Sequence, residues 1–206
     1  MTFADKQDAR WTRTRSKLLH GGRQVFADRG VEAASVLDIV RAAGVSQPSF
    51  YNHFKTKEEL AREIVSDYFR NDSRAKQAVF DRIEDPAEAI AINIAQTLSI
   101  ATNDPVVAWA LVRSESLHSL LFSSRNDPLV NMISEGVSKQ RFVVDDPHVV
   151  ALALRGAALA MVQDLLNVES DDEAIRHFQE LVLRMLGLTP EESAAVVERV
   201  ANTATS

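Results

Sequence analysis

The seven residues from Gln47 to His53 carry side chains that suit contact with a nucleic acid. Projected on a helix at about 100° per residue, Phe50 and Phe54 fall on one side, and Asn52 points to the opposite side. Gln47 lies in the exposed first turn. Gln and Asn can each form paired hydrogen bonds with adenine in the major groove. The pattern therefore predicts a helix that hides its phenylalanines and presents uncharged hydrogen-bonding groups to base edges.

The neighbouring side chains divide into two predicted groups. Pro48 and the methylene of Ser49 offer apolar contact to a thymine methyl group, so the base-reading set is Gln47, Pro48, Ser49 and Asn52. Polar and basic side chains on the flanks, and the N-terminal ends of the adjoining helices, are better placed for phosphates. The phosphate-contacting set is Ser35, Tyr51, His53, Lys55 and Lys57.

Local helix signals position these residues. A first helix of about Thr12 to Asp28 is expected to end at Gly30. Ser35 then caps a short helix, Gly44 ends it, and Ser46 caps the next one. Thr56 with Glu59 has the spacing of a capping box for the helix that follows. Two short helices joined by a tight glycine turn predict a helix-turn-helix.

The stretch from Ser35 to Leu60, SVLDIVRAAGVSQPSFYNHFKTKEEL, resembles the DNA-binding signature of the tetracycline-repressor (TetR/AcrR) family. The resemblance covers about residues 12–60. It implies a homodimer whose three-helix N-terminal domains bind a palindromic operator, and whose last two long helices form a four-helix interface. It also adds Thr12 to the expected phosphate contacts. Gly21 and Gly22 depart from the family pattern, at about 1 kcal/mol per glycine, and predict either a bend or close approach of another helix.

The remainder of the chain is expected to be helical. Five prolines follow a residue that can cap a helix, and proline at the first helical position lacks only an N–H that would be unpaired there. These pairs are Asp85-Pro86, Asp104-Pro105, Asp127-Pro128, Asp146-Pro147 and Thr189-Pro190. No segment alternates strictly between apolar and polar residues. We predict an all-α fold of about nine helices, with a DNA-binding domain over 1–55 and a ligand-binding and dimerisation domain over 56–206.

Composition excludes several classes of protein. The 206 residues contain no cysteine, so disulfide scaffolds and thiolate metal sites are excluded, and we expect no metal or cofactor. The net charge is −6, yet residues 1–60 carry 10 Lys and Arg against 7 Asp and Glu, which favours an anionic partner for this part. Lys6, Arg10 and Trp11 form either an additional phosphate-binding arm or a disordered end. The longest apolar stretch, Val149 to Val162, is too short to span a bilayer and carries Arg155, so a cytoplasmic protein is expected.

The segment from Pro147 to Asn167 is apolar on nearly all sides and contains a strip of small residues at helical spacing. The strip is either buried within one subunit or part of a subunit interface, and we favour the interface. The expected interface residues are Ala153, Gly156, Ala157, Ala160, Phe178, Val182 and Met185.

Residues 105–125 are the best candidates for a small-molecule pocket. Arg113 and His118 each lie within an apolar stripe, where a polar group needs a partner or a ligand. Arg113 is either in a buried ion pair or in contact with a ligand, and His118 is either a core or interface histidine or a ligand contact. An anionic lipophile would suit Arg113 if it faces a cavity. The expected pocket residues are Trp109, Arg113, His118, Phe122 and Met161.

The resemblance implies a ligand-responsive repressor that a small lipophilic effector releases from DNA. An activator or a co-regulator that works without an operator remains as an alternative. An enzyme is the rival from another class, because Glu115 and His118 have the Glu-x-x-His spacing of bundle di-metal sites. Such sites need a second motif of this kind and two further glutamates. The sequence has no second Glu-x-x-His, so we expect no catalysis.

Overall fold

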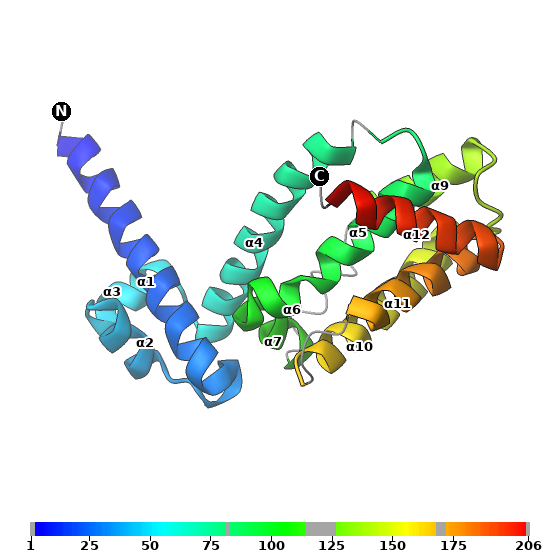
Figure 1. The fold of residues 1–206 in the computed structure, drawn as a ribbon. Helices are drawn as coiled ribbons and strands as arrows, with labels where there is room; N and C mark the ends of the chain where they lie inside the picture. The colour runs from blue at the N-terminus through cyan, green and yellow to red at the C-terminus, as the bar shows by residue number, and fades with distance from the viewer. Residues whose placement is uncertain (1–2, 81–82, 114–126, 168–171, 205–206) are drawn as a thin grey trace.

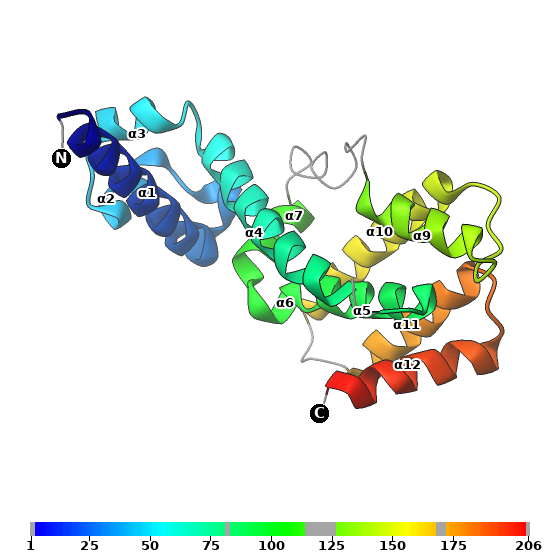
Figure 2. The same cartoon turned by 90° about the horizontal axis from the view of Figure 1, so that it is seen from above.

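The computed structural model describes residues 3–80, 83–113, 127–167 and 172–204. The regular structure of these ranges is entirely α-helical, which confirms the predicted fold class. Both views show a head of α1, α2 and α3 at one end, a body of α5 to α12 at the other, and α4 running from head to body (Figures 1 and 2). The helices are α1 Phe3–Ala33, α2 Val36–Ala43, α3 Gln47–His53, α4 Lys57–Phe80, α5 Pro86–Leu98, α6 Ile100–Asn103, α7 Pro105–Arg113, α9 Pro128–Ser138, α10 Pro147–Leu165, α11 Asp172–Met185 and α12 Pro190–Ala204.

The predicted caps of the head are present. The Ser35 hydroxyl accepts from the backbone N–H of Asp38, and the Asp38 carboxylate accepts from the Ser35 N–H. Gly44 ends α2 in the left-handed region, at φ 60°. The Ser46 hydroxyl accepts from the backbone N–H of Ser49 at the start of α3. The start of each of these two short helices is therefore fixed by a side-chain cap, as the sequence predicted.

The helix α1 is longer than the sequence indicated. It begins at Phe3 rather than near Thr12, and Gly30 interrupts its helical geometry at φ 75° and ψ 166°. Gly21 and Gly22 allow close approach of other helices, the second of the two predicted possibilities. A Cβ on Gly21 would lie 2.7 Å from the backbone nitrogen of Ala43 in α2, and one on Gly22 would meet Leu60 of α4.

The five prolines that follow a capping residue stand at the first positions of α5, α7, α9, α10 and α12. Asp85, Asp127 and Asp146 accept hydrogen bonds from first-turn N–H groups, as the capping argument requires. α5 is the central helix of the body, because it packs against α9, α10, α11 and α12. Gln179 of α11 is buried, and its amide donates to the carbonyl oxygen of Ala91 in α5, 2.8 Å away.

Two clusters of charged side chains join distant segments of the body. Asp85 accepts from Arg141, with 3.0 Å between Oδ1 and Nε, and also pairs with Arg199 of α12. Burial raises the pKa of Asp85, but the hydrogen bonds from Arg141 and from the backbone of Ala87 outweigh it and hold the pKa below its ordinary value. In the second cluster, Arg155 pairs with Asp127.

The helix α10, Pro147–Leu165, is long and apolar enough to span a membrane when only its length and composition are considered. The sequence argument considered only the shorter stretch from Val149 to Val162 and did not predict this. In this fold, one side of α10 packs against the body, where Ala151 and Leu154 are buried. Arg155 on the same helix is mostly buried and forms the ion pair with Asp127. The charged residue inside the apolar segment is therefore satisfied by a partner 28 residues earlier in the sequence.

Candidate nucleic-acid interface

The helix α3 has one buried side, as predicted. Phe50 is fully buried and Phe54 is 4% exposed, and their ring centroids are 6.0 Å apart. Tyr51 meets Phe50 edge to face at 5.4 Å between centroids but remains about half exposed. Burying the two phenylalanines fixes the rotation of α3, because a short helix with one apolar side has one favourable orientation on its core.

The predicted base-reading residues lie on the exposed side. Gln47, Pro48 and Asn52 are exposed, whereas Ser49 is half-buried. The hydroxyl of Ser49 is 2.8 Å from the hydroxyl of Ser46, so it is already engaged at the helix start. Gln47 and Asn52 are the two side chains of this face whose amide groups are free to pair with a base edge.

His53 is placed against α1 rather than fully in the open. Its ring packs on Trp11 with 3.8 Å between centroids, and its Nδ1 is buried without a hydrogen-bond partner among the described atoms. Burial lowers the pKa of the His53 imidazole, and the charge of Arg15 lowers this pKa further. The neutral ring can therefore approach a phosphate only through Nε2.

The residues predicted to contact phosphates differ in their exposure and in their hydrogen bonds. Ser35 and Lys55 are exposed, although the Ser35 hydroxyl also donates to Asp38. Thr12 lies within α1 instead of at a helix start, and its hydroxyl donates to the carbonyl oxygen of Asp8, 2.9 Å away. Arg41 of α2, which the sequence reasoning missed, is exposed and forms no ion pair with a described residue. Its position opposite the buried stripe of α2 is the signal that could have identified it.

Lys57 donates hydrogen bonds at and just after the end of α1. Its ammonium group donates to the carbonyl oxygens of Glu32 at 2.6 Å and Ala34 at 2.8 Å. Glu32 lies in the last turn of α1 and Ala34 in the connection to α2, and both follow the interruption at Gly30. Two of the three N–H groups of Lys57 are thus engaged in holding the end of α1 to the start of α2, which leaves one for the predicted phosphate contact.

Arg15 links α1 to both α3 and α4. Its guanidinium lies 5.4 Å from the centroid of the Phe54 ring and forms an ion pair of 2.9 Å with Glu63. Glu63 pairs also with Arg70, and these two arginines, Arg15 first, hold the pKa of Glu63 below its ordinary value. The end of α3 is therefore fixed relative to the long helix that leads into the body.

Two arginine contacts join the head to α7 of the body. Arg23 of α1 pairs with Asp104, the residue before α7. At the other end of α7, Arg113 stacks on Trp109 at 4.0 Å from the ring centroid, and its Nη1 lies 3.4 Å from the position that a Cβ on Gly30 would occupy. α7 thus lies against α1 with a contact near each of its ends.

The predicted pocket residues are only partly described. Trp109 and Met161 are half-buried, and His118, Phe122 and Glu115 lie outside the described residues. Arg113 is exposed and stacks on Trp109 of its own helix, so the first of its two predicted roles, a buried ion pair, is not what the structure shows. Its predicted contact with a ligand stays a prediction. The apolar stripe that contained Arg113 did not reveal that α7 is covered by the head on one side.

The small-residue strip of α10 faces outward in this chain. Ala153, Gly156 and Ala160 are exposed, Ala157 is half-buried, and a Cβ on Gly156 would meet no other atom within 4 Å. Larger apolar side chains lie around the strip and on α11 at 43–57% exposure. They are Val149, Leu152, Leu181 and Met185.

Phe178 and Val182 do not belong to this outward surface. Phe178 is 7% exposed and Val182 is 1% exposed within the single chain. Their side of α11 faces the body, and the outward side carries Leu181 and Met185. Periodicity showed one stripe on α11 but could not tell whether it covered the subunit's own core or a second subunit.

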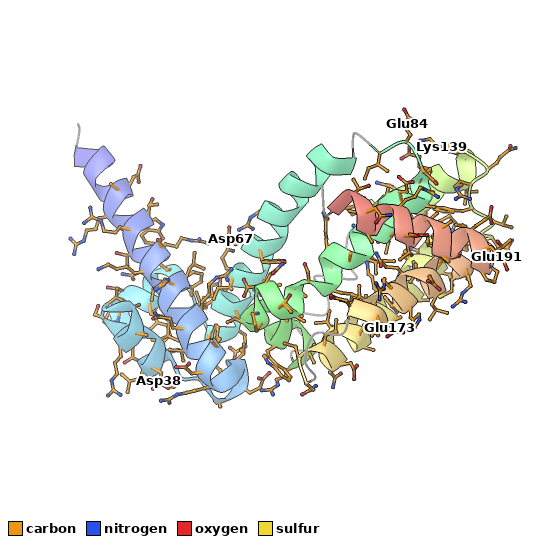
Figure 3. All side chains as sticks on the ribbon, in the orientation of Figure 1. Asp38, Asp67, Glu84, Lys139, Glu173 and Glu191 are labelled. Atoms are coloured by element: carbon orange, nitrogen blue, oxygen red, sulfur yellow. The ribbon has the colours of Figure 1, made fainter. Side chains whose placement is uncertain are left out.

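Acidic side chains are more numerous on the body than on the head, because residues 1–60 carry more Lys and Arg than Asp and Glu while the whole chain has a net charge of −6. Figure 3 shows Glu84, Glu173 and Glu191 on the body, at a distance from the head. Among the labelled residues, Asp38 lies on the head, where it caps α2 and also pairs with Arg29.

No group of three or more His, Asp or Glu side chains that could hold a metal ion occurs in the described part of the chain.

A short helix that exposes amide groups, mounted on a three-helix head and joined to a larger helical body, defines a helix-turn-helix protein of the DNA-binding class. Residues 18–64 match the family of bacterial regulatory proteins named tetR, and residues 85–199 match the tetracyclin repressor-like C-terminal domain. The second match alone spans more than half of the chain, and the chain therefore belongs to the TetR family.

Curated relatives match about a third of the chain. The chain is 36% identical over 76 residues to the HTH-type transcriptional repressor KstR2 of Mycolicibacterium smegmatis, which is 37% of each protein. It is 36% identical over 74 residues to the repressor DhaR of Mycobacterium sp. strain GP1, which is 36% of each. These matches thus span little more than a third of the relatives' length.

Solved structures share the fold of the whole chain. The structure of RolR in complex with resorcinol has a TM-score of 0.76 and 23% identity, with coverage of 93% of this chain and 96% of that one. FadR of Bacillus subtilis in complex with stearoyl-CoA has a TM-score of 0.70 and 18% identity, with coverage of 84% and 99%. At these identities the likeness concerns the fold.

Proposed function

We propose that this protein is a ligand-responsive transcriptional repressor that binds a palindromic operator as a homodimer. The observation that carries the proposal is the outward side of α3, where Gln47 and Asn52 are exposed while Phe50 is fully buried. Uncharged amide groups on a protruding helix suit base edges in the major groove. The named repressors that match about a third of this chain, and the family match over residues 18–64, support the same function.

Each residue of the interface has a proposed role. Gln47 and Asn52 read bases by hydrogen bonds, and Pro48 with the Ser49 methylene contacts a thymine methyl group. Phosphate contacts come from exposed polar and basic groups that surround α3. They are Ser35, Arg41, Tyr51, Lys55 and Nε2 of His53, with Thr12 on the neighbouring side of α1.

The homodimer is proposed to form through α10 and α11. Four apolar side chains on these helices are about half exposed in the single chain, around the open strip at Gly156. Large apolar side chains exposed near one another are typical of a protein interface. A two-fold axis relating two heads would match the symmetry of a palindrome. The proposed surface comprises Val149, Leu152, Ala153, Gly156, Ala160, Leu181 and Met185.

The effector is proposed to be a small, largely apolar molecule bound within the body, with Trp109 and Met161 as candidate contacts. Proteins of similar fold bind resorcinol and stearoyl-CoA in their solved structures, and the aromatic ring of the first and the acyl chain of the second support an effector with a large apolar part. An effector releases DNA only if it binds one arrangement of the heads better than the other. The contacts of α7 with α1, through Asp104 and Arg113, provide a connection between body and head.

An activator is the second candidate, because the activator FasR of Mycolicibacterium smegmatis is 40% identical to this chain over 57 residues. We propose no catalytic role, and we place the protein in the cytoplasm, where a bacterial regulator meets its DNA.

The proposal is tested by selecting duplexes from a random library with the purified full-length protein and measuring their affinity by fluorescence anisotropy. A palindromic selected sequence, bound far more tightly than a scrambled duplex, is the expected result. Failure to enrich any sequence would refute the function. Transcription from a promoter that contains the selected sequence then distinguishes repression from activation.

A further inference from the structure

The start of α1 extends beyond the helices of the head. α1 begins at Phe3, yet Trp11 makes the first contact with another helix among the described side chains. The eight residues before Trp11 correspond to about 12 Å of helix. In both views this end of α1 reaches at least as far from the body as α3 does (Figures 1 and 2). The extension therefore points to the end of the molecule where a duplex bound by α3 would lie.

The extension is fixed to the recognition helix. Trp11 packs on His53, the last residue of α3, with 3.8 Å between ring centroids. One turn later, Arg15 lies over Phe54 and pairs with Glu63. Because these contacts join two successive turns of α1 to the C-terminal end of α3, the direction of the extension follows the orientation of α3.

One side of this part of α1 carries unpaired positive charge. Arg10, Arg13 and Lys17 are spaced at i, i+3 and i+7, which places them on one side of the helix. All three are exposed, and none forms an ion pair with a described residue. By contrast, Arg15 and Arg23 of the same helix are paired with Glu63 and with the residue preceding α7.

Geometry decides which part of a duplex these cations can reach. They lie on the side of α1 opposite to Trp11, and Trp11 faces α3. They are thus turned away from the base pairs that α3 would read. Phosphates of the DNA next to that sequence are anionic, and they continue along the duplex past the end of α3. An unpaired basic face on a protein of net charge −6 is complementary to them.

We propose that residues 3–17, here named the α1 extension, form an additional DNA-binding element that grips the phosphate backbone outside the sequence read by α3. The inference rests on the proposed DNA-binding function and deepens it. Arg10, Arg13 and Lys17 supply affinity without sequence information, and Trp11 is the positioning residue that orients them. The protein therefore binds a duplex longer than its recognition sequence more tightly than one of the length of that sequence.

The test compares two duplexes that contain the selected palindrome. One ends at the outer edges of the palindrome, and the other continues for about ten base pairs on each side. We expect the wild-type protein to bind the long duplex more tightly. The variant R10Q/R13Q/K17Q should lose roughly fivefold per missing contact at 0.15 M salt on the long duplex, with a salt slope lower by about 0.9 per contact. On the short duplex the two proteins should bind alike.

Three further variants separate the effect of charge from the effect of position. Arg176→Gln removes an exposed cation of α11 that pairs with no described residue, and it should leave both affinities unchanged. Trp11→Ala removes no charge but should abolish the preference for the long duplex, and Trp11→Phe should restore most of it. Loss of affinity for both duplexes in Trp11→Ala alone would indicate a structural role and overturn the positioning role.

The remaining outcomes are decisive. Equal binding of wild type and R10Q/R13Q/K17Q to the long duplex overturns the inference, while enrichment of a palindrome keeps the proposed function intact. Absence of binding to any duplex overturns both. Binding to phosphatidylserine vesicles that the triple variant loses, with unchanged affinity for the long duplex, would assign the basic face to a membrane surface and also overturn the inference.

Discussion

The head and the body of this protein are stabilised over different distances along the chain. In the head, Ser35 caps with Asp38, Ser46 with Ser49, and Thr56 with the N–H of Glu59, each three residues away. The body has local helix caps as well, at Asp85, Asp127 and Asp146, but its helices are also joined by polar contacts between partners that are far apart in sequence. Arg141 pairs with Asp85 across 56 residues, and Gln179 bonds to Ala91 across 88.

The relatives show the same difference. Identities of 36–43% are confined to stretches of 51–76 residues in the repressors KstR2 and DhaR, whereas likeness over whole chains appears in folds at 17–23% identity. A surface that reads DNA constrains each exposed side chain, and a packed bundle accepts many apolar combinations of similar volume. Both parts match family models, over residues 18–64 and 85–199, but the likeness to individual solved proteins over the whole chain is one of arrangement rather than of residue identity.

Removing Phe50 should break the head and leave the body intact. Its ring is fully buried, so Phe50→Ala should cost about 3–5 kcal/mol of unfolding free energy in the head and abolish DNA binding. The mass of the assembly in solution, measured by light scattering, should not change. Tyr51→Ala, at a half-exposed neighbour, is the control and should change stability by much less. If Phe50→Ala also dissociates the subunits, head and body unfold as one unit.

A bulky residue at Gly156 should act on the body alone. No atom lies within 4 Å of a Cβ at this position, so Gly156→Leu should leave the folded subunit stable. In a symmetric dimer the new side chain meets the partner twice, at about 1–3 kcal/mol per clash. Analytical ultracentrifugation should show monomers. An undisturbed dimer would exclude the proposed surface on α10.

Replacing Asn52 should weaken specificity without affecting the fold. Asn52→Ala should lose about 1–3 kcal/mol on the selected duplex and leave binding to a scrambled duplex unchanged. Titrations by fluorescence anisotropy on both duplexes measure the difference. An equal loss on both would mean that Asn52 contacts the backbone rather than a base.

Replacing Lys57 and replacing Lys55, two residues apart, should affect different properties: stability in the first case and the salt dependence of DNA binding in the second. Lys57→Ala removes two hydrogen bonds to carbonyl oxygens and should lower the unfolding free energy by about 1–3 kcal/mol, with an unchanged salt slope. Lys55→Ala should leave stability unchanged and lower the salt slope by about 0.9 per contact. Urea titrations and salt-dependent anisotropy separate the two. A reduced slope for Lys57→Ala would support the phosphate contact that the sequence predicted.

Acid should lower the unfolding free energy of the body, because Asp85 becomes protonated. Its pKa is lower when folded than in an unfolded chain, where a carboxyl titrates near pH 4, so the stabilisation is complete above that pH. It is lost as the pH falls through the lower, folded pKa. Asp85→Asn should therefore flatten the dependence of unfolding free energy on pH below about 4. Glu84→Gln, at an exposed carboxylate of the body, serves as the control, and an unchanged slope in Asp85→Asn would contradict this role.

Patterns within a few turns of helix were sufficient to predict much of the head. They gave the caps at Ser35 and Ser46, the turn at Gly44, and the buried side of α3. They also gave the five helices that begin with proline, because a cap and the missing N–H of proline act only on neighbouring residues. They misplaced the start of α1 at Thr12, since the first turns of this helix carry no distinctive cap.

The sequence by itself determined which residues of α3 are buried and which are exposed, because helical periodicity fixes that division once two phenylalanines must leave water. Tertiary structure alone decided the roles of Lys57, Arg113 and Phe178. Each of them contacts, or is covered by, a segment distant along the chain, and side-chain type does not encode which distant segment arrives. The same reason explains Gly21, whose missing side chain becomes meaningful only where α2 approaches α1.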